Sequence, residues 1–214
     1  MQPIPNDPNP AAYLAACEVI DHEHALVREA ADALWATTRN AYSYAESAYE
    51  FVRDTIPHSA DSGDPRVSWR ASDVLATRNG ICHAKAHALV ALLRARGIPA
   101  GLCYQRLADD HECGDSCSGR AGACPGGSRR MVHGLIALRL PGTAVWARQD
   151  PRGNGPGVDA RFSLDAERLA FPVRPELGET DYPGLYAAPH PAVLTALRGS
   201  ADRAQLWRNL PEAL

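Results

Sequence analysis

Apolar residues recur at helical spacing through the first third of the chain. Alanine, leucine and aromatic residues return there about every 3.6 positions, which is the period of an amphipathic helix. The pattern predicts helices over residues 11–20, 22–38 and 42–55, the last capped by Asn40. Residues 1–10 are rich in proline and asparagine, and we expect them to be loosely ordered.

The middle of the chain contains the clearest helix signal. A short helix is predicted over residues 71–76, with Ser72 or Asp73 near its cap. A run of helix-forming residues then predicts a longer helix over residues 82–96. Gly97 ends this helix as a left-handed cap.

The pattern changes to strands after this helix. Alternating and apolar runs predict strands over residues 100–107, 131–140 and 144–149, with Pro141 and Gly142 turning the last two into a hairpin. Residues 108–130 form a Gly-, Cys- and Arg-rich insertion, and residues 191–214 read as a helical stretch broken near Gly199. Helices followed by strands, without regular βαβ alternation, predict an α+β fold.

Composition narrows the class of protein. The chain has 214 residues, 45% of them hydrophobic, which suits a single globular domain over residues 1–214. A formal net charge of -3 and a pI near 6.2 give no electrostatic footprint for nucleic acid. We see no secretory signal and no apolar run of about 18 residues that could span a membrane. We therefore expect a cytoplasmic protein without nucleic-acid or membrane partners, whose six cysteines are reduced, catalytic or metal-bound rather than paired.

Cys82 follows a turn at Asn79 and Gly80 and opens the predicted helix. Free backbone N–H groups and the helix dipole favour negative charge at that position, which lowers the pKa of a thiol. The same N–H groups can hold a developing oxyanion. The alternative is a buried core cysteine, because Cys82 shares an apolar stripe with Ala86 and Leu89.

His133 and Asp150 are the two residues that favour a catalytic cysteine. His133 is conspicuous in an apolar strand, and Asp150 ends the next strand just before a proline. The predicted hairpin brings their two strand ends side by side, and imidazole beside carboxylate is the pair that a cysteine nucleophile needs. The alternatives are a histidine satisfied within the sheet and an aspartate that only forms a turn.

These residues also carry a family resemblance. The segments 79–89 and 92–100, in which a Gly-x-Cys turn starts a helix and Gly-Ile-Pro-Ala leads into a strand, resemble the core motif of transglutaminase-like proteins. The resemblance continues around His133 and through residues 150–154, and covers roughly residues 45–165. It implies a papain-like fold with the nucleophile's helix packed on an antiparallel sheet. It further implies that Cys82 is the nucleophile, His133 the general base and Asp150 the group that orients the imidazole.

Five other residues near Cys82 have two interpretations each. His58 and Trp69 could line a cleft or help to form an oxyanion hole, or they could be a surface histidine and a packing tryptophan. His83 and His87 lie on the helix of Cys82, and neither clearly faces its sulfur, so both could be helix surface. Lys85 could add positive potential near the helix start, but a solvated lysine is the default.

The insertion holds four soft ligands within a short span: His111, Cys113, Cys117 and Cys124. The first cysteine spacing suits structural zinc, whereas the second is less typical. A disulfide is the second interpretation, and free thiols in a loop are the third.

Three functions follow from these residues. The first is a cysteine-dependent acyl-transfer enzyme that acts on a protein, peptide or small carboxamide substrate and needs no cofactor and no metal in its site. The second is a non-catalytic binding or scaffold module that keeps the fold. The third is an interaction domain stabilised by zinc at residues 111–124. The sequence leaves the acyl acceptor and the oligomeric state open.

Overall fold

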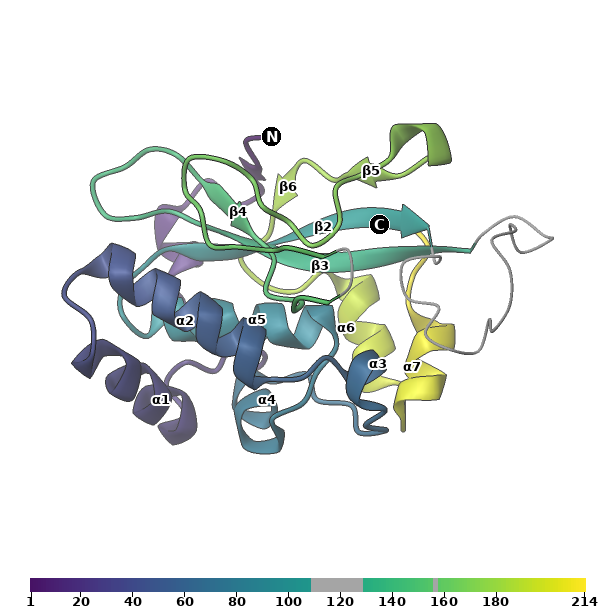
Figure 1. Ribbon diagram of the computed structural model, residues 1–214, viewed down its shortest axis with the longest axis horizontal. Coiled ribbons are helices and arrows are strands. Elements are labelled where there is room, and N and C mark those ends of the chain that lie inside the picture. Colours follow the sequence, from purple (N-terminus) through teal and green to yellow (C-terminus); the bar gives the residue numbers. More distant parts are fainter. Residues whose placement is uncertain (109–128, 156–157) are drawn as a thin grey trace.

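Helices cover one side of an antiparallel sheet in the computed structural model, which describes residues 1–108, 129–155 and 158–214 (Figure 1). The helices are α1 (Ala25–Ala36), α2 (Ala41–Thr55), α3 (Ser59–Ser62), α4 (Ala71–Thr77), α5 (Cys82–Arg94), α6 (Pro191–Arg198) and α7 (Arg203–Asn209). The strands are β1 (Ile4–Pro5), β2 (Ala100–Ala108), β3 (Arg130–Leu138), β4 (Ala147–Gln149), β5 (Thr180–Asp181) and β6 (Gly184–Leu185). Short 3-10 turns occur at Pro10–Tyr13 and Pro175–Leu177.

The main sheet has the strand order β4-β3-β2-β5 and is antiparallel throughout. Its longest ladder joins β2 and β3 from Ala100 opposite Leu138 to Ala108 opposite Arg130. A second, two-stranded sheet pairs β1 with β6 in parallel. The predicted α+β class is confirmed.

The central helix is α5, and all of its residues are buried. It contacts β2 and β3 on one side and α1, α2 and α4 on the others (Figure 1). A helix that is surrounded in this way needs mostly small and apolar residues, which its run of alanine, leucine and valine supplies. The hydrogen bond from the Tyr44 hydroxyl to the carbonyl oxygen of Leu92 ties it to α2.

Both faces of β3 are buried, but in different cores. Val132, Ile136 and Leu138 belong to the main core that includes α5. Leu135 and Ala137 alternate with them and pack into a second core. The opposite face of the sheet is therefore covered as well.

β4 pairs with residues 136–138 of β3, and no strand among the described residues pairs with the first half of that edge. There the N–H of Val132 donates to the carbonyl oxygen of Pro211, 3.0 Å away, and the Val132 carbonyl oxygen binds the ring of His83 at 2.9 Å. The start of α5 thus lies against the open edge of β3. This arrangement brings Cys82 close to the strand that carries His133.

The N-terminal predictions are wrong in part. Residues 1–10 are not all loosely ordered, because Ile4 and Pro5 form β1. The helix expected over residues 11–20 is reduced to the turn Pro10–Tyr13. Val19 and Ile20 are buried in the main core, and the Val19 carbonyl accepts a hydrogen bond from the N–H of Ala71. Tertiary burial therefore overrides the helix propensity of the alanines here.

The next helix is shorter than the predicted span of 22–38. The ring of His24 accepts a hydrogen bond from the N–H of Leu26 and so starts α1 at Ala25. The hydroxyls of Thr37 and Thr38 donate to carbonyls of the last turn, which ends the helix.

Caps and breaks later in the chain agree better with prediction. Asn40 caps α2 in a reciprocal arrangement with Ser43, as predicted. The C-terminal stretch is helical on either side of Gly199, also as predicted. The cap of α4 differs, because Arg70 is the N-cap residue and Ser72 instead donates to the carboxylate of Asp21.

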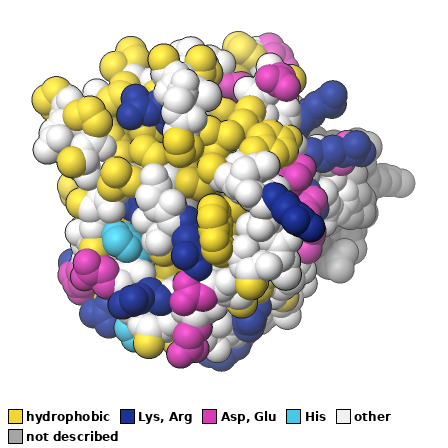
Figure 2. Space-filling model, turned by 90° about the vertical axis from the view of Figure 1, so that its left-hand side faces the viewer, with side chains coloured by type: hydrophobic (Ala, Val, Ile, Leu, Met, Phe, Trp, Pro, Cys, Tyr) yellow, Lys and Arg dark blue, Asp and Glu magenta, His cyan; other side chains and the backbone are white. Residues whose placement is uncertain are grey.

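Hydrophobic side chains gather on one flank of the molecule (Figure 2). Among the described residues, the large hydrophobic side chains that are exposed include Ile4, Leu26, Trp35, Tyr42 and Val145. No helix in the described ranges is long and apolar enough to cross a membrane.

Candidate active site

Cys82 is the first residue of α5, and its position is set by the turn before it. Its N-cap residue, Ile81, has no side chain that caps the helix, so the N–H groups of the first turn keep no capping partner. Gly80 is needed in this turn, since a Cβ there would lie 2.8 Å from the Cβ of Ala84. The Cys82 side chain is buried, with 6% of the residue's surface exposed.

His133 and Asp150 form a buried hydrogen-bonded pair. The Nε2 atom of His133 lies 2.9 Å from Oδ2 of Asp150, and neither residue is more than 2% exposed. Phe171 contacts the His133 ring edge-on, with ring centroids 5.2 Å apart. The ring is thereby fixed on two sides, and its Nδ1 atom is left for the Cys82 thiol, with which His133 also interacts.

Other groups hold the Asp150 carboxylate in place. Its Oδ1 accepts the N–H of Arg152 at 3.1 Å, and its Oδ2 accepts the N–H of Ala170 at 3.2 Å. The Tyr49 hydroxyl donates to the Asp150 carbonyl at 3.0 Å. These contacts hold the side chain and backbone of Asp150 in place beside His133.

The pKa values of Cys82 and His133 are shifted in opposite directions. Burial alone raises the pKa of the Cys82 thiol, but the electrostatic influence of His83 and His133 and a hydrogen bond with the His133 ring hold it well below its usual value. Burial alone lowers the pKa of His133, but Asp150 and the Cys82 sulfur raise it well above its usual value. The arrangement therefore favours a thiolate beside an imidazolium.

His83 is buried rather than part of the helix surface. Its Nε2 binds the carbonyl oxygen of Val132, and its ring occupies the space beside Gly134. A Cβ on Gly134 would lie 2.3 Å from the His83 Nδ1, so only glycine fits there. The start of α5 thus packs closely against the short segment Val132-His133-Gly134.

His58 also lies next to the thiol and is 2% exposed, so it is not a surface histidine. It caps the short helix α3, with its Nδ1 accepting the N–H of Ala60 at 3.3 Å. The surface interpretation fails because His58 forms a parallel bridge with Gly80 in the turn before Cys82. This bridge holds the segment that carries His58 in the protein interior.

Trp69 and His87 lie apart from the thiol chemistry. Trp69 is half-buried between the guanidinium groups of Arg70 and Arg198, as a packing tryptophan. His87 binds the Trp69 carbonyl at 2.8 Å, and burial lowers its pKa to about 3, so its ring is neutral. It too is buried rather than on the surface of α5.

Lys85 is fully buried, which overturns its interpretation as a solvated lysine. Its Nζ donates to the carbonyls of Arg53 at 3.1 Å and Ile56 at 2.6 Å, at the end of α2. The pKa of Lys85 is lowered to about 7, mainly because of its burial. Lys85 therefore connects α5 to the segment that leads into His58.

An ion pair joins the segments that follow His58 and Asp150. Arg152 donates to both carboxylate oxygens of Asp61, at 2.5 and 3.0 Å. Asp61 follows His58 by three residues, and Arg152 follows Asp150 by two. This bidentate pair fixes the two sides of the site relative to each other.

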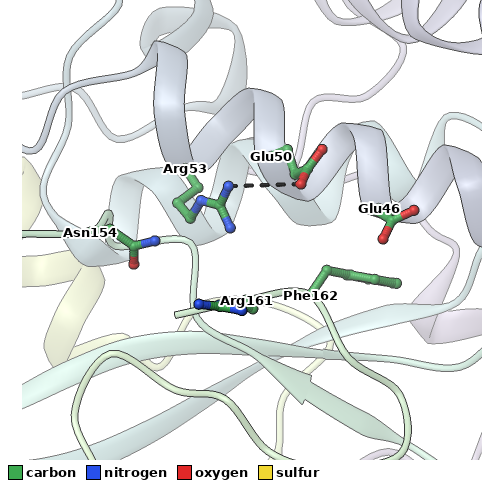
Figure 3. A pocket seen from close by; sticks show the side chains of 6 residues that line it. All are labelled: Glu46, Glu50, Arg53, Asn154, Arg161 and Phe162. Carbon is green, nitrogen blue, oxygen red and sulfur yellow. Dashed lines mark ion pairs between the residues drawn. The ribbon is translucent and has the colours of Figure 1, made fainter. Parts of the chain in front are cut away.

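Two cavities elsewhere are lined by none of Cys82, His133 and Asp150. One of about 340 Å³ is lined by Glu46, Glu50, Arg53, Asn154, Arg161 and Phe162 (Figure 3). Figure 3 shows Glu50 paired with Arg53 at its wall, a contact of 3.8 Å. Another, of about 210 Å³, lies between N-terminal prolines and Trp146.

Metal binding was predicted only for the insertion. His111, Cys113, Cys117 and Cys124 lie outside the described residues, so zinc, a disulfide and free thiols all stay predictions. Among the described residues no group of three or more His, Cys, Asp or Glu could hold a metal ion. Cys17, Cys82 and Cys103 are free thiols.

A thiol at a helix start beside a buried histidine–carboxylate pair, on an α+β framework, defines a class of cysteine-dependent enzymes. The sequence matches the model of the transglutaminase-like superfamily over residues 28–151, more than half of the 214 residues. The chain therefore belongs to the transglutaminase-like superfamily and has its fold, as predicted.

Comparison with curated proteins gives no match. Among solved structures, the chain is similar to a proposed cysteine protease from Cytophaga hutchinsonii, with 19% sequence identity and a TM-score of 0.49. The similarity covers 68% of this chain and 43% of that chain, less than half of its length.

Proposed function

We propose that this protein is a cysteine-dependent acyl-transfer enzyme in which Cys82 is the nucleophile, His133 the general base and acid, and Asp150 the orienting carboxylate. One observation carries the proposal: the His133 ring is hydrogen-bonded to Asp150 at 2.9 Å and also interacts with a thiol whose pKa is lowered despite burial. These groups come from the start of α5, from β3 and from the residue that follows β4. A core cysteine with no chemical task would instead have a raised pKa.

The reaction begins with attack of the Cys82 thiolate on the carbonyl carbon of a carboxamide or peptide. A carbon–sulfur bond forms, and the carbonyl oxygen takes up the electron pair as an oxyanion. When the oxyanion collapses, the carbon–nitrogen bond breaks and the leaving amine or ammonia takes a proton from His133. A thioester on Cys82 remains.

The thioester is resolved by a second nucleophile. Water or an amine attacks the same carbon while His133 takes its proton, and the thiolate leaves. Water gives hydrolysis, as in a peptidase or amidase, and a primary amine gives transamidation. We propose a protein, peptide or small carboxamide as the acyl donor, with no cofactor required, and the cytoplasm as the compartment, where free thiols persist.

Limiting iodoacetamide tests the nucleophile. Cys103 is an internal control, because it is also buried, with 1% of its surface exposed against 6% for Cys82, and burial raises its pKa to about 12. We expect peptide mapping at pH 7 to find Cys82 modified well before Cys103, and equal reactivity of both after denaturation. If folded Cys82 reacts no faster than Cys103, the proposal fails. Ammonia release from a glutamine peptide, with and without a primary amine, then identifies the acceptor.

A further inference from the structure

We propose that His58 supplies an oxyanion-binding donor to this site, its Nε2–H acting together with the backbone N–H of Cys82. The inference rests on the acyl-transfer function proposed above and adds a catalytic residue to it. The group that His58 would bind is the negatively charged oxygen of the tetrahedral intermediate. Three features of the His58 ring support this role.

The first feature is the tautomer of the ring. The Nδ1 atom accepts the backbone N–H of Ala60, 3.3 Å away, so this nitrogen carries no proton. A neutral ring then has its proton on Nε2. His58 is therefore a fixed hydrogen-bond donor at Nε2 as long as it caps α3.

The second feature is the surroundings of that Nε2–H. The ring lies against the Cys82 thiol and contributes to its electrostatic environment. Nevertheless, the contact lacks the geometry of a regular N–H···S hydrogen bond, and the buried Nε2 has no other partner within the described ranges. A buried donor without a good partner is costly, and an incoming oxyanion beside the sulfur would satisfy it.

The third feature is how rigidly the ring is held. His58 forms a parallel bridge with Gly80, and the N–H of Ser59 donates to the Gly80 carbonyl at 3.1 Å. The same short segment is tied to Arg152 through Asp61. An oxyanion donor must be in position before the reaction to stabilise the transition state, and these contacts provide that preorganisation.

Capping alone does not explain where His58 lies. His24 and His190 cap α1 and α6 in the same way, each with Nδ1 accepting the N–H two residues later at 3.3 Å. His24 is exposed, whereas His58 is buried against the thiol. A role as general base also fits His58 poorly, because its Nδ1 is bound by a backbone N–H, while that of His133 is free to face the sulfur.

Two reactions of Cys82 separate the oxyanion role from an effect on the sulfur. Iodoacetamide forms a carbon–sulfur bond and expels iodide, and no carbonyl oxygen gains charge. p-Nitrophenyl acetate forms a carbon–sulfur bond at its carbonyl carbon, passes through an oxyanion and then expels p-nitrophenolate. Both rates are measured over a pH series and compared on the alkaline plateau, where the thiol is fully ionised. Cys82→Ala gives the background.

We expect His58→Ala to slow acylation by about 10²–10³-fold while plateau alkylation is little changed, as for loss of one oxyanion donor. His58→Gln, which keeps an N–H donor, should recover part of the acylation rate and remains informative if His58→Ala does not fold. His24→Ala removes an equivalent cap and should change neither rate.

Equal slowing of both reactions in His58→Ala, or unchanged acylation, overturns the role of His58 and leaves the nucleophile assignment intact. A wild-type protein whose Cys82 gives no p-nitrophenolate burst overturns the acyl-transfer function itself, and this inference with it.

Discussion

His133 and Asp150 are hydrogen-bonded at 2.9 Å although they are not partners across the sheet. The ladder of β3 and β4 ends with Ile136 opposite Gln149, and its continuation places Asp150 beside Leu135. The two side chains therefore meet diagonally, on the same face of the sheet. This geometry requires β4 to stop early, and the same early stop opens the edge of β3 to the start of α5.

Asp150→Asn removes the charge and keeps the size of the side chain. Without that charge, the His133 imidazolium loses its main support and the pKa of Cys82 rises. We expect alkylation of Cys82 by iodoacetamide to slow on the acid side of its pH profile, by about tenfold for each unit of that rise. The alkaline plateau should persist, and thermal melts should show a folded protein. An unchanged pH profile would contradict the orienting role of Asp150.

Gly134→Ala tests the close fit between β3 and α5. The added Cβ would lie 2.3 Å from the His83 Nδ1 and 3.1 Å from its Cα, and a backbone atom cannot move away cheaply. Overpacking of this kind costs about 1–3 kcal/mol, so we expect a lower midpoint in denaturant and slower alkylation of Cys82. Gly155→Ala is the control, because a Cβ there would meet no atom of the described residues within 4 Å. Equal stability of the two variants would show that α5 can shift without cost.

The sequence was sufficient to predict where Cys82, His133 and Asp150 lie in the fold. Cys82 opens α5 and Asp150 directly follows β4, and local chemistry marks both boundaries: Gly80 before Cys82 and a proline after Asp150. His133 lies inside β3, which the turn at Pro141 and Gly142 connects to β4. Such signals depend on neighbouring residues alone. The nucleophile helix and the hairpin were therefore predictable within a few residues.

The surroundings of the thiol could not be predicted in the same way. Lys85 has the sequence context of a solvated helix residue, and its burial depends on carbonyls at the end of α2. The polar segment around His58 has no apolar pattern, and its burial depends on contacts with distant residues, such as the bridge to Gly80 and the ion pair of Asp61 with Arg152. β1 has two residues, too few for a periodic signal, and exists only because β6 is its partner. For His58, the one hint in the sequence was its position directly after Pro57 and before a Ser-Ala-Asp turn.

Lys85→Met tests the charge state of the buried lysine. The pKa of Lys85 is lowered to about 7, below the unfolded value of about 10.4, so the unfolded chain binds more protons between these pH values. The contribution of Lys85 to stability should therefore rise with pH across this window, by up to about 1.4 kcal/mol per pH unit, and be lost as pH falls through 7. Denaturant unfolding of wild type and Lys85→Met at several pH values measures this difference. A difference that is independent of pH would mean that the lysine stays charged.

Asp61→Asn tests whether the ion pair with Arg152 positions His58. Asp61 is half exposed, and an exposed pair contributes at most about 1 kcal/mol, so we expect a small loss of stability. Burial raises the pKa of Asp61, but the hydrogen bonds from Arg152 outweigh this effect and lower it. The small contribution of the pair to stability is therefore present at neutral pH and lost in acid.

The rate of acylation of Cys82 by p-nitrophenyl acetate should fall by a larger factor than the small loss of stability explains, because the turn that carries His58 is released from the side of the site that carries Asp150. The rate of alkylation by iodoacetamide on the alkaline plateau should stay close to that of the wild type. Asp64→Asn is the matched control, since Asp64 pairs with Arg66, two residues away in the same loop. If both variants acylate alike, the Arg152–Asp61 pair contributes to folding alone and His58 is positioned by its bridge to Gly80.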